Sequence, residues 1–155
     1  MLTTIVAFSD SHNAPIPKRL LDLIDENNYV FFLGDGINSL GDVLLHKGFI
    51  GVNGNCDRPL LNDEEVLEID NVKILITHGH KYGVKRDLTA LALRAQELGC
   101  NVVFYGHTHF AHIDEYQNIT FVCPGAISSP LCGAQSYAYA IIHNGKFTAK
   151  IVNLT

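Results

Sequence analysis

The 155-residue sequence has no tryptophan, a single methionine and few charged residues, and it lacks any long hydrophobic run. No apolar stretch approaches the ~18 residues that a membrane-spanning helix needs. The apolar start is not preceded by a basic segment, as a secretory signal peptide would be, and leads into the polar stretch that begins at Ser9. We therefore expect a cytoplasmic protein with no membrane partner.

Positive charge is also scarce. Eleven lysines and arginines stand against 16 aspartates and glutamates, and the net charge is −5. No basic cluster interrupts this acidic balance, so nucleic acid is not an expected partner. If the chain acts on a phosphate group, a bound metal ion has to supply the positive charge.

The cysteines show no paired C-x-x-C spacing, which argues against a structural zinc site. There are four of them: Cys56, Cys100, Cys123 and Cys132. Because no export signal is evident, we expect these residues to be thiols that are buried as small apolar side chains.

The order of the expected elements predicts an α/β fold. The chain begins with alternating strands and helices and ends with consecutive strands, and its length suits a single domain over residues 1–155. Helices are expected at residues 16–26 and 86–98, with a short helix ending near Lys47. Strands are expected at residues 3–8, 29–33, 50–52, 65–69, 72–77, 102–105, 113–116, 120–123, 137–143 and 146–152.

Five of these strands end in a short loop with carboxylate, amide or imidazole groups. The loops read Ser9-Asp10-Ser11-His12, Gly34-Asp35-Gly36, Asn53-Gly54-Asn55-Cys56-Asp57, Thr77-His78-Gly79-His80 and Gly106-His107-Thr108-His109. Each residue alone could cap a helix or stabilise a turn. Together, the loops should meet at the carboxyl ends of the strands, where α/β proteins bind ligands. So many acidic groups in one place require a cation, and the donors suit Mn²⁺, Fe²⁺ or Zn²⁺.

In this order, the five motifs resemble those of the calcineurin-like metallophosphoesterase superfamily, and specifically its small YfcE-like phosphodiesterase branch. The resemblance covers roughly residues 5–125. It implies an α/β four-layer sandwich of two mixed β-sheets flanked by helices, with a two-metal site at the strand ends.

The resemblance also implies a role for each motif residue. Asp10, His12 and His109 would bind one divalent ion, Asn55, His78 and His107 would bind a second, and Asp35 would bridge the two. The catalytic residues would be Asp35, Asn55, His78, Asp57 and His80. For Asp57 a turn role stays open, and for His80 exposure to solvent. Mn²⁺ is the first expectation for the metal, with Fe²⁺, Zn²⁺ or Ni²⁺ as alternatives, and His46, His112 and His143 are interpreted as surface residues.

The implied reaction is hydrolysis of a small phosphodiester by a hydroxide that bridges the two metals. The sequence departs from the family pattern at Cys56, where many members have a histidine that is thought to protonate the leaving group. A thiol is a poor replacement, which favours diesters with acidic leaving groups. A serine and an arginine that often contact substrate in this branch are absent, with Ala126 and Leu131 in the corresponding stretches.

Other functions stay open. A phosphomonoesterase or protein phosphatase would need the same metals. A non-catalytic scaffold of this fold, like the related retromer subunit, should have lost metal ligands, whereas all seven positions here have kept them. Nucleases of the superfamily are longer than this acidic chain. The oligomeric state is also open, and a homo-oligomer is one of the alternatives.

Overall fold

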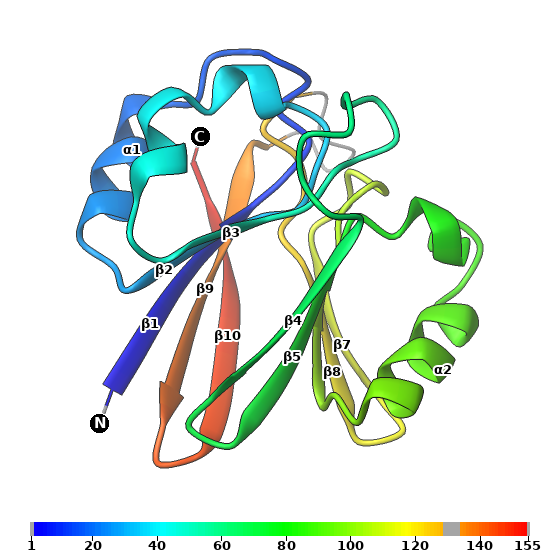
Figure 1. Cartoon of the computed structure of the whole chain (residues 1–155). Coiled ribbons are helices and arrows are strands. Elements are labelled where there is room, and N and C mark those ends of the chain that lie inside the picture. Colours follow the sequence, from blue (N-terminus) through cyan, green and yellow to red (C-terminus); the bar gives the residue numbers. More distant parts are fainter. Residues whose placement is uncertain (1, 129–133, 155) are drawn as a thin grey trace.

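The computed structural model describes residues 2–128 and 134–154, and it contains two mixed sheets of five strands each (Figure 1). The first sheet has the order β10-β9-β1-β2-β3 and the second the order β4-β5-β6-β8-β7. The strands are β1 (Leu2–Phe8), β2 (Tyr29–Phe32), β3 (Phe49–Gly51), β4 (Glu64–Ile69), β5 (Val72–Thr77), β6 (Val102–Phe104), β7 (His112–Tyr116), β8 (Ile119–Cys123), β9 (Ser136–His143) and β10 (Lys146–Asn153).

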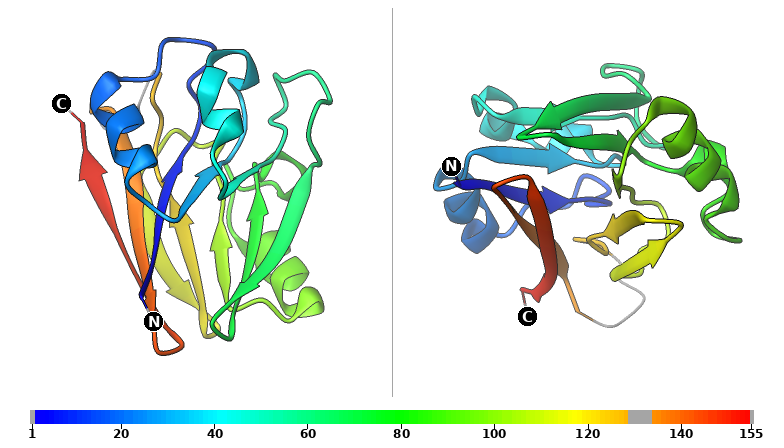
Figure 2. Two further views of the ribbon diagram at one scale, coloured as in Figure 1. Left: turned by 60° about the vertical axis from the view of Figure 1, so that its left-hand side comes forward. Right: turned by 90° about the horizontal axis from the view of Figure 1, so that it is seen from below.

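Each sheet combines parallel and antiparallel strands. Strands β1, β2 and β3 are parallel, as are β5, β6 and β8, and the other pairings are antiparallel. Two α-helices, α1 (Lys18–Asp25) and α2 (Thr89–Leu98), lie on opposite sides of the pair of sheets (Figure 2). The predicted four-layer sandwich of two mixed β-sheets flanked by helices is confirmed.

The helices are shorter than expected for local reasons. Helix α1 begins after Pro17, whose φ of −54° suits entry into a helix. Helix α2 begins at Thr89. The Thr89 N–H donates to the Asp87 carboxylate (3.0 Å), and this contact holds the residues just before Thr89 in a turn. The short helix expected near Lys47 is instead formed by two 3₁₀ helices, η1 (Ile37–Ser39) and η2 (Gly41–Leu45).

Alternation along the strands separates three apolar layers. Phe31 faces the other sheet and meets the Phe104 ring edge to face, with ring centroids 5.1 Å apart. Its neighbours Val30 and Phe32 face the opposite way and pack in the layer that contains Leu20 of α1. A third layer packs α2 on the outer face of the second sheet. This packing fixes the two sheets relative to each other.

The two ends of the sandwich have different roles. At the end where β1 begins, the hairpin turns β4–β5 and β9–β10 lie together, and the Gly145 N–H donates to the Asp70 carboxylate (2.8 Å) (Figure 1). The two-residue turns Asp70-Asn71 and Asn144-Gly145 have positive φ at both positions, as type I′ turns require. The loops that follow β1, β2, β3, β5 and β6 gather at the opposite end.

Within the part of the chain that the structure describes, no helix is long and apolar enough to cross a membrane. Cys100 and Cys123 are free, buried thiols, as expected. The expectation of burial is wrong for Cys56, which is exposed because it lies in the turn after β3. Leu131 and Cys132 lie outside the described residues.

Candidate metal centre

A buried carboxylate with an unsatisfied oxygen lies at the centre of the gathered loops. Asp10 is fully buried, and its Oδ1 has no hydrogen-bond partner among the described residues. Three imidazole nitrogens face this oxygen: Nε2 of His109 at 3.3 Å, of His12 at 3.7 Å and of His78 at 3.9 Å. A buried anionic oxygen without a donor is costly, and a shared cation would remove that cost.

Two of the groups that the surrounding ligand atoms form are centred on Asp10 and Asp35, and a third, made of His12, Asp35 and Cys56, overlaps them. Asp10, His12 and His109 form one group and Asp35, His78 and His107 the other, and the ligand atoms within each group lie within 4.8 Å of one another. Asp35 Oδ2 is 3.2 Å from His78 Nε2 and 3.9 Å from His12 Nε2, so it lies between the groups. Mixed carboxylate and imidazole donors suit divalent transition metals.

The orientation of His78 leaves one ring nitrogen for a metal. His78 Nδ1 lies 2.6 Å from the Leu33 carbonyl oxygen, to which it donates a hydrogen bond. This leaves Nε2 as the ring nitrogen that a metal could bind; it lies 3.2 Å from Asp35 Oδ2 and 3.2 Å from His107 Nδ1. Such a backbone contact is how proteins fix a metal-binding imidazole.

Asp57 supports the centre from behind. Its carboxylate accepts four backbone N–H groups, from Asp35 (2.7 Å), Gly36 (2.8 Å), Ile37 (3.1 Å) and Gly54 (2.8 Å). Four donors occupy the acceptor sites of a carboxylate, so Asp57 ties the loop after β3 to the loop after β2. This arrangement assigns it a positioning role, and its contacts are with the protein backbone.

The ligand positions have strained backbones. Five of the seven predicted ligands have φ between 47° and 74°, a region that side-chain-bearing residues rarely occupy: Asp10, His12, Asp35, His107 and His109. Each such residue costs about 1–3 kcal/mol and is typical of functional sites. The loops after β2 and β3 also approach each other closely, and this requires glycine at position 54, because a Cβ on Gly54 would lie 2.0 Å from Asp35 Oδ1. The fold maintains this strain at one end of the sandwich.

Charges in the centre shift the pKa values of its members. Burial would raise the pKa of Asp35, but the hydrogen bond and charge of His78 lower it to about 2. Burial would lower the pKa of His78, but its contacts with Asp35 and Asp10 raise it. Burial and the charges of His78 and Lys85 lower the pKa of His107 to about 4. His107 is therefore neutral near pH 7, as a metal ligand must be.

The remaining predicted residues lie at the rim. Asn55 is exposed, its amide donates to Cys56 Sγ (3.5 Å), and its role as a ligand stays a prediction. His80 is half-buried in the 3₁₀ helix η3 (His80–Tyr82), with its ring centroid 5.4 Å from that of His78. Its Nδ1 is buried and has no hydrogen-bond partner among the described residues. The His80 ring lies beside the rings of His78 and His107, and therefore borders the ligand group to which they belong.

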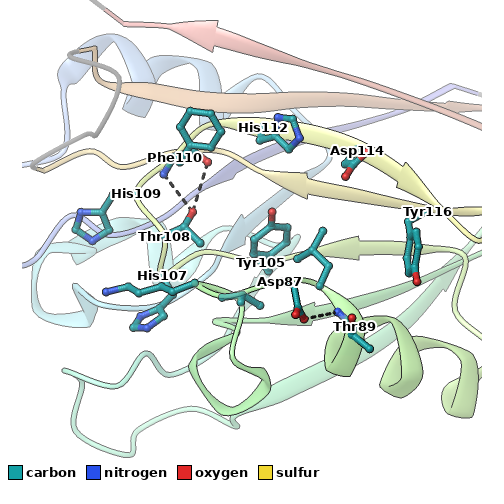
Figure 3. Close-up of a pocket in the computed structure, with 13 residues that line it drawn as sticks. Asp87, Thr89, Tyr105, His107, Thr108, His109, Phe110, His112, Asp114 and Tyr116 are labelled. Carbon is teal, nitrogen blue, oxygen red and sulfur yellow. Dashed lines mark hydrogen bonds between the residues drawn. The ribbon is translucent and has the colours of Figure 1, made fainter.

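A groove of about 920 Å³ extends from the metal centre along the outer side of the second sheet (Figure 3). We call it the β7 groove. It lies between the segment that leads into α2 and strand β7, and its lining comprises Val84, Lys85, Asp87, Leu88, Thr89, Tyr105, His107, Thr108, His109, Phe110, His112, Asp114 and Tyr116. Sequence reasoning missed Lys85, Phe110 and Tyr116 as groove residues. For Phe110 and Tyr116 the available signal was the spacing of two that they share with His112 and Asp114, which places them on one face of a strand.

Comparisons with known proteins show the family of the chain. A family model described as the calcineurin-like phosphoesterase superfamily domain matches residues 3–145. The chain is 37% identical to the probable metallophosphoesterase YsnB of Bacillus subtilis, over 64% of this chain and 60% of that protein's length. It is 25% identical to the phosphodiesterase YfcE of Escherichia coli, over 94% of this chain and 90% of that protein.

Solved structures show the same fold. A predicted phosphoesterase from Streptococcus pneumoniae has a TM-score of 0.84 and 29% identity, and the match covers 99% of this chain and 90% of that one. Vps29 from Entamoeba histolytica has a TM-score of 0.81 and 24% identity, with 99% and 100% coverage, and the likeness is one of fold alone.

Proposed function

The chain belongs to the calcineurin-like phosphoesterase superfamily, and from this premise we propose that it is a metal-dependent phosphodiesterase acting on small phosphodiesters. The superfamily consists of phosphoesterase hydrolases that use divalent metals. The diester specificity, the two-metal centre and the assignment of ligands are our proposal. So are a single domain over residues 1–155 and a cytoplasmic location.

The observation that supports the proposal best is the unsatisfied Asp10 Oδ1, which faces three imidazole nitrogens at 3.3–3.9 Å. The donors fit two cations. One would be held by Asp10, His12 and His109, the other by Asn55, His78 and His107, and Asp35 would contact both. Mn²⁺ is the first candidate, and Fe²⁺, Zn²⁺ and Ni²⁺ suit the same donors.

When bound, the two ions lower the pKa of water and neutralise charge on the phosphate. The protein's own residues then orient the reactants. Water adds to phosphorus, the bond to one ester oxygen breaks, and that oxygen leaves with a proton from solvent. His80 lies at the rim beside His78, where its partly exposed imidazole can approach a phosphate oxygen. Burial and the negative charge of Asp35 raise the pKa of Cys56, so this thiol is a weak acid.

The test compares bis(p-nitrophenyl) phosphate with p-nitrophenyl phosphate, using Mn²⁺-loaded protein with and without a chelator. We expect the diester to react at least about tenfold faster, and we expect activity to disappear with chelation. Turnover that survives rigorous chelation would overturn the metal-dependent mechanism. Faster hydrolysis of the monoester would reassign the chain to the phosphomonoesterases or protein phosphatases. Absence of hydrolysis of either ester by protein with two bound ions would favour a scaffold.

A further inference from the structure

The β7 groove opens directly onto the metal centre. His107 and His109 line the groove and also belong to the two ligand groups. A phosphodiester bound at the centre carries two organic groups, and at least one of them has to leave the centre through an adjoining space. The volume of about 920 Å³ is in the range of small-molecule sites. The groove is therefore placed to receive an ester group of the substrate.

The groove has an aromatic wall with exposed ring surface. Phe110 and Tyr116 are 44% and 42% exposed, and they are the only aromatic residues among the large apolar side chains with high exposure in the described part of the chain. The Phe110 ring stacks on the His112 ring at 26° and 5.6 Å, which fixes its orientation. Figure 3 shows Phe110, His112 and Tyr116 along one side. Exposed aromatic faces favour a planar ring as ligand.

The charges along the groove differ between its two ends. Near the metal centre Lys85 lines the groove together with His107, so this end favours an anion. Farther along, Asp87 and Asp114 present carboxylates, and Thr89 adds a hydroxyl. These groups accept hydrogen bonds from hydroxyl or amino donors. A plain alkyl chain would cover these exposed carboxylates without offering them hydrogen-bond donors, whereas a group with an aromatic ring and several donors would pair with them.

We propose that the β7 groove binds the nucleoside part of a nucleoside phosphodiester, an inference that rests on the proposed phosphodiesterase function. The phosphate lies at the metal centre beside Lys85. The base stacks against the ring of Phe110 next to the metal centre, and the sugar hydroxyls or base amino groups donate to Asp87 and Asp114. The substrate class is thereby narrowed from small phosphodiesters to those that carry a nucleoside.

The experiment keeps the leaving group constant and changes the other ester group. The Mn²⁺-loaded protein is assayed with the p-nitrophenyl ester of thymidine 5′-monophosphate and with p-nitrophenyl methyl phosphate. We expect kcat/KM to be at least about tenfold higher for the thymidine ester. The ratio should fall toward one in Phe110→Ala, and Phe110→Trp should retain it because the stacking surface remains. Leu93→Ala, which removes a side chain that is 61% exposed outside the groove, is the matched control.

A binding measurement separates this inference from the proposed function. Calorimetric titration with thymidine 5′-monophosphate should give a Kd at least about tenfold weaker in Phe110→Ala than in wild type or Leu93→Ala. Thermal unfolding verifies that the variants are folded, as expected for substitution of a half-exposed side chain. If neither p-nitrophenyl ester is hydrolysed, the proposed function fails, while the titration still tests the groove. Equal ratios and equal Kd values in wild type and Phe110→Ala would overturn the nucleoside assignment.

Discussion

The carboxylate of Asp57 accepts a hydrogen bond from the backbone N–H of Asp35 at 2.7 Å. The residue that lies between the two ligand groups is thus held by a side chain from another loop. The same carboxylate accepts the N–H groups of Gly36, Ile37 and Gly54. The position of Asp35 therefore depends on an anion that contacts only the backbone around it.

This contact predicts the effect of Asp57→Asn. An amide has one acceptor oxygen, and its NH₂ group would face N–H donors, so the two loops would separate. We expect Mn²⁺ affinity to fall about 10–100-fold, the usual effect of removing a residue that orients metal ligands. Calorimetric titration measures it, with the exposed Asp42→Asn as the matched control. An affinity within twofold of wild type would show that Asp57 does not position the centre.

A second prediction concerns metal stoichiometry and the sorting of histidines. Elemental analysis after Mn²⁺ loading should give two ions per chain, and Asp35→Ala should weaken both sites and abolish hydrolysis. His46 has a different role, because its Nε2 donates to the Asn27 carbonyl (3.0 Å) and its Nδ1 accepts the Gly48 N–H (2.9 Å). His46→Ala should therefore keep near wild-type activity and lose about 1 kcal/mol of stability.

Two outcomes would contradict the assignment of Asp35 to the metal centre and of His46 to a structural role. One ion or none per chain would remove the basis for placing Asp35 between two metals. Equal loss of activity in Asp35→Ala and His46→Ala would mean that the histidines have been sorted wrongly. Urea unfolding of both variants separates a loss of metal from a loss of fold.

Much of the fold follows from local sequence patterns. The apolar runs before Ser9 and Tyr105 predict buried strands, and the Asn144-Gly145 pair predicts the hairpin that the structure contains. The extent of each helix did not follow from periodicity. Apolar spacing continues into residues 86–88, where the Asp87 side chain forms a turn instead. Capping contacts of this kind depend on side-chain geometry that periodicity does not report.

The candidate site, like the fold, could be predicted only in part from the sequence. The convergence of Asp10, Asp35 and His78 was predictable, because the carboxyl ends of parallel strands meet at one end of a sheet. The role of Asp57 was not, since its partners are backbone groups from a loop about 20 residues away. Lys85 and Phe110 belong to segments far apart in sequence, and only the packing of α2 beside β7 brings them to one groove.

The pH dependence of stability provides a third prediction. Glu64 on β4 accepts hydrogen bonds from Arg94 on α2, from Nε (3.0 Å) and Nη2 (2.6 Å), and from the Tyr82 hydroxyl. Burial would raise the pKa of Glu64, but these contacts lower it below the usual 4.5. A lowered pKa in the folded state means that the ionised form stabilises the fold above about pH 4.5. This contribution is lost as the pH falls through the folded-state pKa.

Glu64→Gln should thus cost about 1 kcal/mol at pH 7, a modest value because the pair is partly exposed to solvent. The difference from wild type should shrink below pH 4.5, where the native carboxyl also becomes protonated. Urea unfolding at pH 7 and in acid measures it, with the exposed Glu115→Gln as the control. A difference that stays constant with pH would assign the cost to packing and not to charge.

Cys56 provides the last prediction, which concerns the leaving group. Cys56 is exposed and stands where many superfamily members have a histidine. The partial loss of solvent around its thiol and the negative charge of Asp35 raise the pKa of Cys56. A thiol is also a weak hydrogen-bond donor, so it gives little help to a departing alkoxide. Hydrolysis should therefore depend steeply on leaving-group acidity, with an aryl diester cut far faster than an alkyl diester.

Cys56→Ser should be nearly silent for both diesters, because the thiol transfers no proton. Cys56→His should raise the rate for the alkyl diester selectively, since an imidazole with a pKa near neutrality can protonate the leaving oxygen. A competing role follows from geometry: Cys56 Sγ and ligand atoms of His12 and Asp35 lie within 4.8 Å of one another. If the thiol binds metal, Cys56→Ser should lower Mn²⁺ affinity together with the rate for both diesters. Titration of Cys56→Ser with Mn²⁺ distinguishes a thiol that binds metal from one that does not. A large loss of Mn²⁺ affinity would contradict the prediction that this substitution is nearly silent.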